Sequence, residues 1–238
     1  MLSRNVGESV SLLNPISVGG RTIRAIVFDM DGLMFNTEDL YDVVGQQMLE
    51  RRGHAFDLDL KLKMMGRTAN AAFEIMRQAC GLSESIEELK RENDQLFMEL
   101  LETRLEKLPG LDTLMGWVAE RRLPLGLATS SRRFLADYKL NRFGLTPRFQ
   151  AIVTGDEVRH GKPDPEIYLA VAKQLNVAPT EMLAFEDSVV GSTAAASAGA
   201  FTVAVPGKHG EHLDYSHVDL VVKQLDAPPI RELFAPER

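Results

Sequence analysis

Short apolar runs alternate with amphipathic stretches through the second half of the chain. Five of these runs have the length and composition of buried parallel strands. They cover residues 123–128, 151–154, 182–185, 201–205 and 220–222. Apolar residues at helical spacing fill most of the intervals, at 111–122, 132–143, 165–175 and 189–198. Because alternating strands and helices with right-handed crossovers build a parallel sheet, this half predicts an α/β fold.

The first half has a different pattern. Residues 24–28 (RAIVF) form one more apolar run of strand length. Helical spacing then dominates at 37–52, 57–65, 67–79 and 83–107. Ser83 is the candidate cap of the last of these helices, and no convincing strand lies between residues 37 and 108. Pro109 and Gly110 break the chain before the alternating pattern begins.

These patterns together predict a doubly wound, Rossmann-like parallel-sheet core that is interrupted by an all-helical insertion. The core is expected to contain residues 21–36 and 109–238, and the helical domain residues 37–108. Residues 1–20 are expected to be a weakly structured extension.

Composition and charge exclude several classes of function. Of the 238 residues, 45% are hydrophobic and 26% are charged, which is ordinary for a soluble globular protein. The formal net charge is −7 with scattered Lys and Arg, so we expect no nucleic-acid partner. No apolar run approaches the roughly 20 residues of a membrane span, and residues 1–20 lack the layout of a secretory signal. The single Cys80 cannot form an intrachain disulfide, which suits a cytoplasmic protein.

Four polar segments stand at or near the ends of predicted strands. They are 28–32 (FDMDG), 128–131 (ATSS), 161–165 (GKPDP) and 185–188 (FEDS). In a doubly wound sheet, ligands bind at the carboxyl ends of the strands. We therefore expect the four segments to converge on one edge of the sheet.

The first segment suggests nucleophilic catalysis by a carboxylate. Asp29 and Asp31 are separated by one residue, and two carboxylates this close invite a metal ion or a shared proton. We assign Asp29 as nucleophile and metal ligand, and Asp31 as the acid and base that serves the leaving oxygen and then water. Gly32 allows the chain to turn sharply after the pair. The alternative is an Asp pair that only caps or turns the chain.

The second and third segments suit an anionic substrate. Thr129 and Ser130 follow a strand and lead into a helix, so a hydroxyl and main-chain N–H groups can cradle phosphate. The alternative for this pair is a plain helix N-cap. The Lys162 ammonium can offset phosphate charge and the Asp29 carboxylate. A solvated surface lysine is the alternative for Lys162.

The fourth segment suggests a hard metal ion. Glu186 and Asp187 end an apolar strand, and carboxylate oxygens favour Mg²⁺. No His or Cys cluster has the spacing of a zinc site. The alternative is an acid pair that complements the dipole of the next helix.

With these residues assigned, the chain resembles phosphatases of the haloacid dehalogenase superfamily that carry a helical cap. The resemblance covers about residues 24–206, through FDMDGLMFNTE, LATSS, HGKPDPEIY and AFEDSVVGSTAAASAGA in that order. It implies that Mg²⁺ is held by Asp29, the Asp31 carbonyl, Asp187 and Glu186. It also implies that the substrate phosphate meets Gly32, Thr129, Ser130 and Lys162, and that the helical insertion closes over the substrate. Asn36 stands where many relatives carry Asp, and we expect little effect on the chemistry.

Side-chain identities narrow the reaction within the superfamily. Dehalogenases lack the second Asp of the first motif, so Asp31 favours phosphate-ester chemistry. β-Phosphoglucomutases carry a His four residues after the first-motif Thr and an Arg three residues after the cap-loop Gly. This chain has Tyr41 and Ala69 there, which favours a hydrolase. We expect Tyr41 and Arg67 to contact substrate, although Arg67 could also be a surface residue at a helix start.

The chain is also similar to pseudouridine-5′-phosphate phosphatases and to small sugar-phosphate phosphatases, through TEDLYDVV, MMGRTANAAFEIM and LPLGLATSS. The leading hypothesis is a Mg²⁺-dependent phosphomonoesterase that acts on a small sugar phosphate or nucleoside-like phosphate. The alternatives are a phosphosugar mutase and a metabolite-binding protein without activity. We expect a monomer or a weak dimer.

Overall fold

The computed structural model of the chain describes residues 14–64, 69–208 and 210–235. The residues fall into two compact units, which are described separately. The α/β unit contains the described residues up to Met30 and from Pro109 onward, and the helical unit is Asp31–Leu108. The helical unit begins at Asp31, before the expected boundary at Thr37, because Phe35 forms isolated bridges with both Asp31 and Lys107.

The α/β unit is built on a six-stranded sheet in the order β5-β4-β3-β6-β7-β8. Every neighbouring pair in this sheet is parallel, so the predicted fold class is confirmed. The strands are β3 (Ala25–Phe28), β4 (Leu125–Thr129), β5 (Ala151–Thr154), β6 (Met182–Glu186), β7 (Phe201–Ala204) and β8 (Leu220–Val221). The four residues of β3 are all buried, as expected for a strand covered on both faces.

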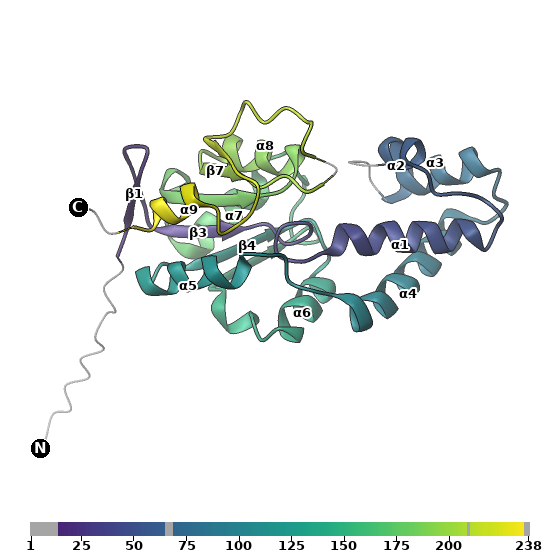
Figure 1. Cartoon of the computed structure of the whole chain (residues 1–238), viewed down its shortest axis with the longest axis horizontal. Coiled ribbons are helices and arrows are strands. Elements are labelled where there is room, and N and C mark those ends of the chain that lie inside the picture. The colour runs from purple at the N-terminus through teal and green to yellow at the C-terminus, as the bar shows by residue number, and fades with distance from the viewer. Residues whose placement is uncertain (1–13, 65–68, 209, 236–238) are drawn as a thin grey trace, which may run out of the picture. The chain divides into compact units, whose positions relative to one another are not determined.

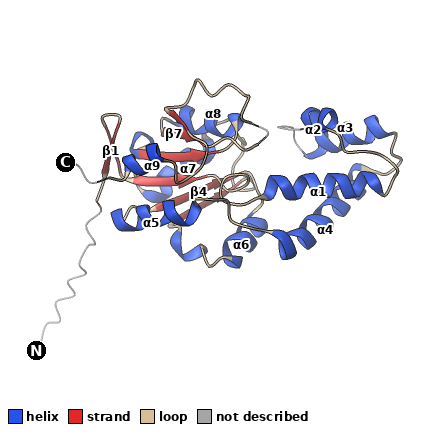
Figure 2. Cartoon of the chain, in the orientation of Figure 1, coloured by secondary structure: helices blue, strands red, loops and turns tan. Residues whose placement is uncertain are grey.

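Helices cover both faces of this sheet (Figures 1 and 2). They are α5 (Leu111–Arg121), α6 (Arg133–Arg142), α7 (Glu166–Leu175), α8 (Val189–Ala198) and the short α9 (Pro228–Leu233), with 3₁₀ turns at Thr146–Arg148 and Pro179–Glu181. Right-handed crossovers place α5 and α6 on one face and α7 and α8 on the other. The buried core on the second face joins Tyr168 and Val171 of α7 with Ala194 and Ala195 of α8 and with Val27 of β3.

A hairpin precedes the sheet, which corrects part of the sequence analysis. Ile16–Val18 (β1) pairs antiparallel with Arg21–Ile23 (β2), so the expected extension 1–20 contains a strand; residues 1–13 lie outside the described residues. Gly19 and Gly20 connect the two strands with φ of 56° and 77°. Positive φ at both central positions is the requirement of the hairpin turn whose twist matches the strands.

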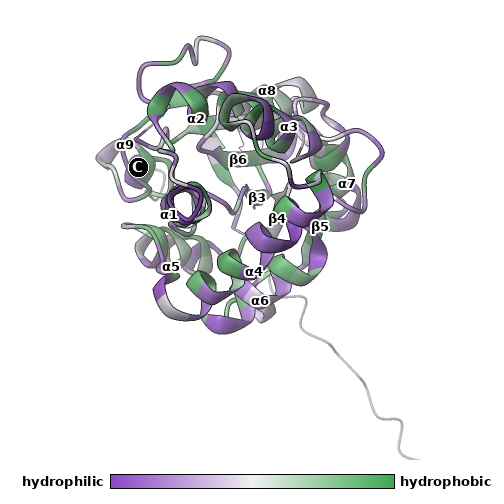
Figure 3. Cartoon of the chain, turned by 90° about the vertical axis from the view of Figure 1, so that its right-hand side faces the viewer, coloured by the Kyte–Doolittle hydropathy of each residue, from purple (hydrophilic) through white to green (hydrophobic). Residues whose placement is uncertain are grey.

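The helical unit contains α1 (Thr37–Glu50), α2 (Leu58–Met64), α3 (Ala69–Cys80) and α4 (Ile86–Arg104), and no strand among its described residues. The ribbon of α4 alternates between hydrophilic and hydrophobic residues (Figure 3), as expected for an amphipathic helix. This helix is shorter than the predicted 83–107. Its cap is Ser85 and not Ser83, because the Ser85 and Glu88 side chains bond each other's main-chain N–H groups in a capping box.

Across the described ranges, we find no helix with the length and apolar character needed to cross a membrane.

Candidate active site

Three buried carboxylates meet at the carboxyl end of the sheet. Asp29 follows β3, and Glu186 and Asp187 lie at the end of the neighbouring β6. The parallel register pairs Phe28 with Phe185, so Asp29 comes level with Glu186. One oxygen from each of the three carboxylates lies within 4.8 Å of the others, and the residues are 6%, 0% and 6% exposed. The structure therefore brings together two of the four predicted segments at this point.

Lys162 from the third segment joins the same cluster. Its Nζ lies 2.5 Å from Asp29 Oδ1, 2.5 Å from Glu186 Oε1 and 2.9 Å from Ala128 O. The Lys162 side chain is only 5% exposed, so it is not a solvated surface lysine. Burial alone lowers the pKa of this ammonium. The Asp29 and Glu186 carboxylates raise the pKa by more than burial lowers it, so the pKa lies above its ordinary value.

The loop that carries Lys162 is fixed by side chains on either side of it. Glu166, the first residue of α7, accepts hydrogen bonds from the main-chain N–H groups of Arg159 and His160 at 2.9 and 3.0 Å. These bonds lower the pKa of the Glu166 carboxyl. Asp164 Oδ1 accepts a hydrogen bond from Glu166 N at 2.9 Å. His160, Asp164 and Glu166 lie close enough together to hold a metal ion, and the hydrogen bonds of Asp164 and Glu166 shape this loop.

Glu186 accepts hydrogen bonds on both of its carboxylate oxygens. Its Oε1 accepts hydrogen bonds from Lys162 Nζ and from the Tyr168 hydroxyl, the latter at 2.9 Å. Its Oε2 accepts from the main-chain N–H groups of Asp187 and Ser188 and from the Ser188 hydroxyl. A Cβ added at Gly191 would lie 1.9 Å from Glu186 Oε1, so the first turn of α8 leaves room for this carboxylate only because residue 191 is glycine.

Two tyrosines missed by the sequence analysis contact the cluster. Tyr168 of α7 is fully buried, and its ring lies 5.1 Å from Lys162 Nζ. Burial and then the Glu186 charge raise the pKa of the Tyr168 phenol well above its usual value. The Tyr215 hydroxyl donates to the main-chain oxygen of Asp187 at 2.9 Å. Tyr168 lies in an apolar helical stripe and Tyr215 in a loop, so spacing alone gave no signal for either.

The acid pair does not serve as a helix terminus. Ser188 is the N-cap of α8, since its side chain accepts a hydrogen bond from Gly191 N at 3.0 Å, and the first turn contains no acidic residue. Glu186 and Asp187 precede this cap. The two carboxylates therefore lie just before α8 and outside its first turn.

The second segment forms a tight loop between β4 and α6. Thr129 is fully buried at the end of β4, and its Oγ1 accepts a hydrogen bond from Ser131 N at 3.1 Å. Ser130 is exposed. The N-cap of α6 is Arg132, whose side chain makes no capping hydrogen bond, while Asp156 accepts a hydrogen bond from Arg133 N at 3.1 Å. Thr129 is therefore not the cap of this helix, and its hydroxyl lies at the carboxyl end of β4.

The remaining predicted site residues belong to the helical unit. Asp31 is half-buried, and Gly32 has φ of 80° and donates from N to Thr37 Oγ1 and Phe35 O, both at 3.1 Å. Tyr41 is 41% exposed and stacks on Phe97 with ring centroids 4.1 Å apart. Arg67 lies outside the described residues. The sharp turn after Asp31 is observed, while the substrate contacts of Tyr41 and Arg67 stay predictions.

The cluster could hold a metal ion. Three carboxylates face one ammonium, so negative charge exceeds positive charge among these four groups. The available ligands are oxygen atoms, which suit a hard divalent cation rather than zinc or copper. The Asp29 and Asp187 carboxylates therefore suit the hard metal ion that the sequence predicts, whereas both oxygens of Glu186 already accept hydrogen bonds.

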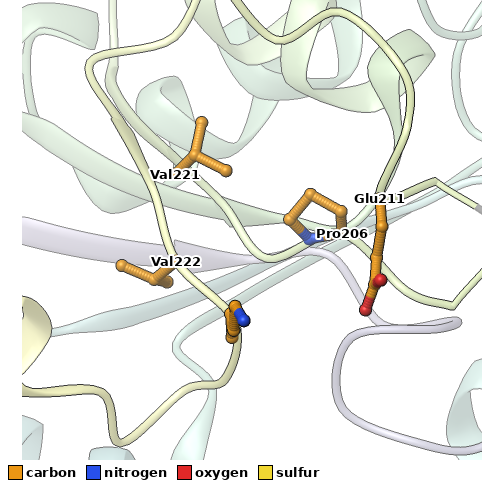
Figure 4. Close-up of a pocket in the computed structure, with 5 residues that line it drawn as sticks. Pro206, Glu211, Val221 and Val222 are labelled. Carbon is orange, nitrogen blue, oxygen red and sulfur yellow. The ribbon is translucent and has the colours of Figure 1, made fainter.

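A pocket of about 300 Å³ lies farther along the same edge of the sheet (Figure 4). It is lined by Pro206, which follows β7, by Val221, Val222 and Lys223 around the end of β8, and by Glu211. None of its lining residues belongs to the predicted site. The carboxylate cluster and this pocket are therefore separate features of the α/β unit.

Comparisons with known proteins agree with this site. The model of the haloacid dehalogenase-like hydrolase family matches residues 26–205. A phosphorylated carbohydrates phosphatase of Thermotoga maritima is 38% identical over 181 residues, 74% of this chain and 82% of that protein. (DL)-Glycerol-3-phosphatase 2 of Arabidopsis thaliana is 36% identical over 217 residues, 87% of this chain and 89% of that protein. The β-phosphoglucomutase of Bacillus subtilis is 31% identical over 209 residues, 85% of this chain and 90% of that protein.

The family match spans most of the α/β unit and all of the helical unit. It includes the strands that carry the carboxylates and the loop that carries Lys162. The resemblance predicted from the sequence is confirmed, and the chain belongs to the haloacid dehalogenase-like hydrolase family.

Proposed function

We propose that this protein is a Mg²⁺-dependent phosphatase of small phosphorylated metabolites that works through a phosphoryl group carried by Asp29. The observation that supports this most directly is the buried Lys162 ammonium, which contacts Asp29 and Glu186 beside Asp187. A buried ion cluster of this kind contributes little to stability, because the desolvation of its charges offsets their attraction. Its chemistry suits phosphoryl transfer.

Asp29 acts as the nucleophile. The adjacent Lys162 ammonium favours the ionised form of the Asp29 carboxyl, which is the form that attacks. One carboxylate oxygen attacks the substrate phosphorus as the ester P–O bond breaks, and the phosphoryl group moves to Asp29. Thr129, Ser130 and Lys162 stabilise the phosphoryl oxygens through a hydroxyl, main-chain N–H groups and a positive charge.

Asp31 handles the protons in both halves of the reaction. It gives a proton to the leaving alcohol oxygen in the first step. It then takes a proton from a water molecule that attacks the phosphorus, and the bond between Asp29 and phosphorus breaks to release inorganic phosphate. One group can serve as acid and then as base because the second step is chemically the reverse of the first.

Mg²⁺ is assigned to Asp29, Asp187 and the Asp31 carbonyl, where it would supply positive charge against the transferring phosphoryl group. We assign Glu186 to Lys162 rather than to the metal, because hydrogen-bond donors already occupy both of its oxygens. In this role Glu186 holds the ammonium in place and fixes the backbone at Asp187.

The proposed substrate class is a small sugar, polyol or nucleoside-like phosphate. The names of the similar phosphatases from Thermotoga maritima and Arabidopsis thaliana support a phosphorylated carbohydrate or glycerol phosphate. Selectivity is assigned to the helical unit, with Tyr41 and Arg67 as the candidate contacts.

A panel of phosphate esters tests the proposal. Sugar phosphates, glycerol 3-phosphate, nucleotides and pseudouridine 5′-phosphate are incubated with Mg²⁺ or with a chelator, and inorganic phosphate is measured. We expect Mg²⁺-dependent release from a narrow set, and its loss in Asp29→Asn. Asp137→Asn is the matched control, since Asp137 is a partly exposed aspartate of α6 that pairs with Arg133. Substantial Mg²⁺-dependent turnover by Asp29→Asn would refute the assignment.

A phosphosugar mutase is the second candidate, supported by the similarity to the Bacillus subtilis enzyme. The residues at the two mutase positions, Tyr41 and Ala69, argue against it. β-Glucose 1-phosphate, supplied with a hexose bisphosphate, separates the two. Glucose 6-phosphate formed faster than free phosphate would establish the mutase.

A further inference from the structure

A lysine occupies the buried stripe of helix α6. The buried residues of this helix are Leu135, Ala136, Lys139 and Leu140, and Lys139 is 0% exposed. Positions four residues apart share one face of a helix, so Lys139 stands where Leu135 predicts another apolar side chain. An ammonium group placed there loses its hydration and must be compensated by polar contacts.

The Lys139 ammonium contacts the loop that is assigned to phosphate binding. Lys139 Nζ donates a hydrogen bond to Ser131 Oγ at 3.0 Å. Ser131 N in turn donates to Thr129 Oγ1 at 3.1 Å, and Ser131 O accepts from Gly155 N at 3.0 Å. The serine is therefore bonded through its side chain, its amide and its carbonyl.

The loop is confined from the side of β5 as well. A Cβ added at Gly155 would lie 2.3 Å from Ser130 O, so the backbone after β5 packs directly against the exposed serine. Gly155 and Lys139 both contact this loop, so groups outside the loop constrain the backbone conformation of residues 129–131. The main-chain N–H groups that would meet phosphate depend on that path.

We propose that Lys139 is a positioning residue that holds the Thr129–Ser131 loop in its phosphate-binding conformation through Ser131. It acts through its hydrogen bond to Ser131 Oγ. This inference rests on the proposed phosphatase function, which assigns the loop to phosphate.

A purely structural role for Lys139 makes a different prediction. Replacing a buried ion by an apolar side chain of similar length is often neutral or stabilising for the fold. Lys139→Met should therefore fold, and its thermal unfolding separates stability from phosphate affinity. A structural lysine would change the unfolding temperature and leave phosphate affinity unchanged.

The test measures the affinity for inorganic phosphate by calorimetry, and its inhibition of 4-nitrophenyl phosphate hydrolysis, in Lys139→Met, Ser131→Ala and the double variant. We expect phosphate affinity to fall about tenfold in each single variant, in line with the loss of a charge-assisted hydrogen bond. We expect the double variant to be no weaker than Ser131→Ala, because both changes break one interaction. Lys173→Met, which removes an exposed lysine of α7, is the matched control and should bind phosphate as the wild type does.

Unchanged phosphate affinity in Lys139→Met would overturn the inference, as would losses that simply add in the double variant. If Lys139→Met does not fold, wild-type affinity in Ser131→Ala overturns it equally well. The proposed function fails separately, when the wild type hydrolyses no ester of the panel; phosphate binding measured by calorimetry still tests Lys139 in that case.

Discussion

One charge cluster from each unit shows how differently charged side chains can be buried. In the α/β unit, Asp29, Glu186 and Asp187 are buried with Lys162 at the end of the sheet. In the helical unit, the Arg52 side chain is 19% exposed and reaches Glu84 at 2.8 Å and Glu92 at 2.6 Å. The hydrogen bonds that this guanidinium donates to Glu92 and Glu84 raise its pKa, so it stays charged at any ordinary pH.

The difference in burial predicts a difference in what the two sets of charges contribute to stability and activity. Ion pairs open to solvent contribute at most about 1 kcal/mol each, because water and salt screen them. Breaking a buried pair by removing one partner costs about 3–5 kcal/mol, because a buried charge is left uncompensated. A substitution in the carboxylate cluster should therefore change activity and stability together, whereas a substitution at Arg52 or its partners should do little to either.

The largest expected effect comes from separating the roles of Glu186 and Asp187. In Glu186→Gln, the amide keeps the shape but loses the charge that holds Lys162, so we expect kcat to fall by about 100-fold or more, equivalent to roughly 3 kcal/mol. In Asp187→Asn, we expect weaker Mg²⁺ binding, since that carboxylate is the proposed ligand. Calorimetric titration with Mg²⁺ and steady-state kinetics measure both quantities.

Glu92→Gln is the matched control from the helical unit. It removes a carboxylate bonded to a cation, as Glu186→Gln does, but near the surface. We expect an unchanged kcat and a loss of free energy of unfolding of about 1 kcal/mol or less. The assignment of Glu186 to Lys162 would be wrong if Glu186→Gln weakened Mg²⁺ binding as strongly as Asp187→Asn does.

The next effect is steric. Gly191→Ala would place a Cβ 1.9 Å from Glu186 Oε1, so the carboxylate must move away from Lys162 and Tyr168. We expect a loss of several kcal/mol of stability, in the range of about 3–5 kcal/mol, with a loss of phosphatase activity. Gly116→Ala in α5 meets no atom within 4 Å and should stabilise the protein by about 0.5–1 kcal/mol. Thermal and urea unfolding of both variants measure the two changes in stability, and a phosphatase assay measures activity. A Gly191→Ala protein with wild-type stability and activity would contradict this prediction.

The convergence of the carboxylates could be predicted from the sequence because it depends only on strand topology. Asp29 and Glu186 each stand at the end of an apolar run, and parallel neighbours bring such ends together. Strand topology gave no prediction of strand β1, since β1 is only three residues long and lies in a hairpin outside the six-stranded sheet. Its one visible signal is the Gly19-Gly20 pair.

The residues that support the cluster from helices were harder to predict. Tyr168 sits among Ile167, Val171 and Ala172, and helical periodicity shows it only as part of an apolar face. Its bond to Glu186 depends on how α7 packs on the sheet, which no local pattern contains. Lys139 was not singled out from the sequence, because the group it contacts is set by the loop after β4.

A smaller effect is expected for the stability of the protein at alkaline pH, which can be compared at two tyrosines, one from each unit. Burial and the Glu186 charge raise the pKa of Tyr168 above that of the unfolded chain, so the folded protein keeps a proton that the unfolded chain loses. The stability from this phenol is therefore fully present below about pH 10 and decreases as the pH rises above it. Tyr168→Phe removes that term together with the bond to Glu186.

We expect Tyr168→Phe to be less stable than the wild type by about 1 kcal/mol at pH 8. The gap should narrow by about 1 kcal/mol as the pH is raised to about 11, because only the wild type loses the buried-phenol term. Tyr41→Phe, at a tyrosine that is 41% exposed, keeps the ring that stacks on Phe97 and should follow the wild type over the whole range. Urea unfolding of the three proteins at both pH values measures this. A gap that stays constant with pH would show that the Tyr168 hydroxyl acts only through its hydrogen bond and not through its buried proton.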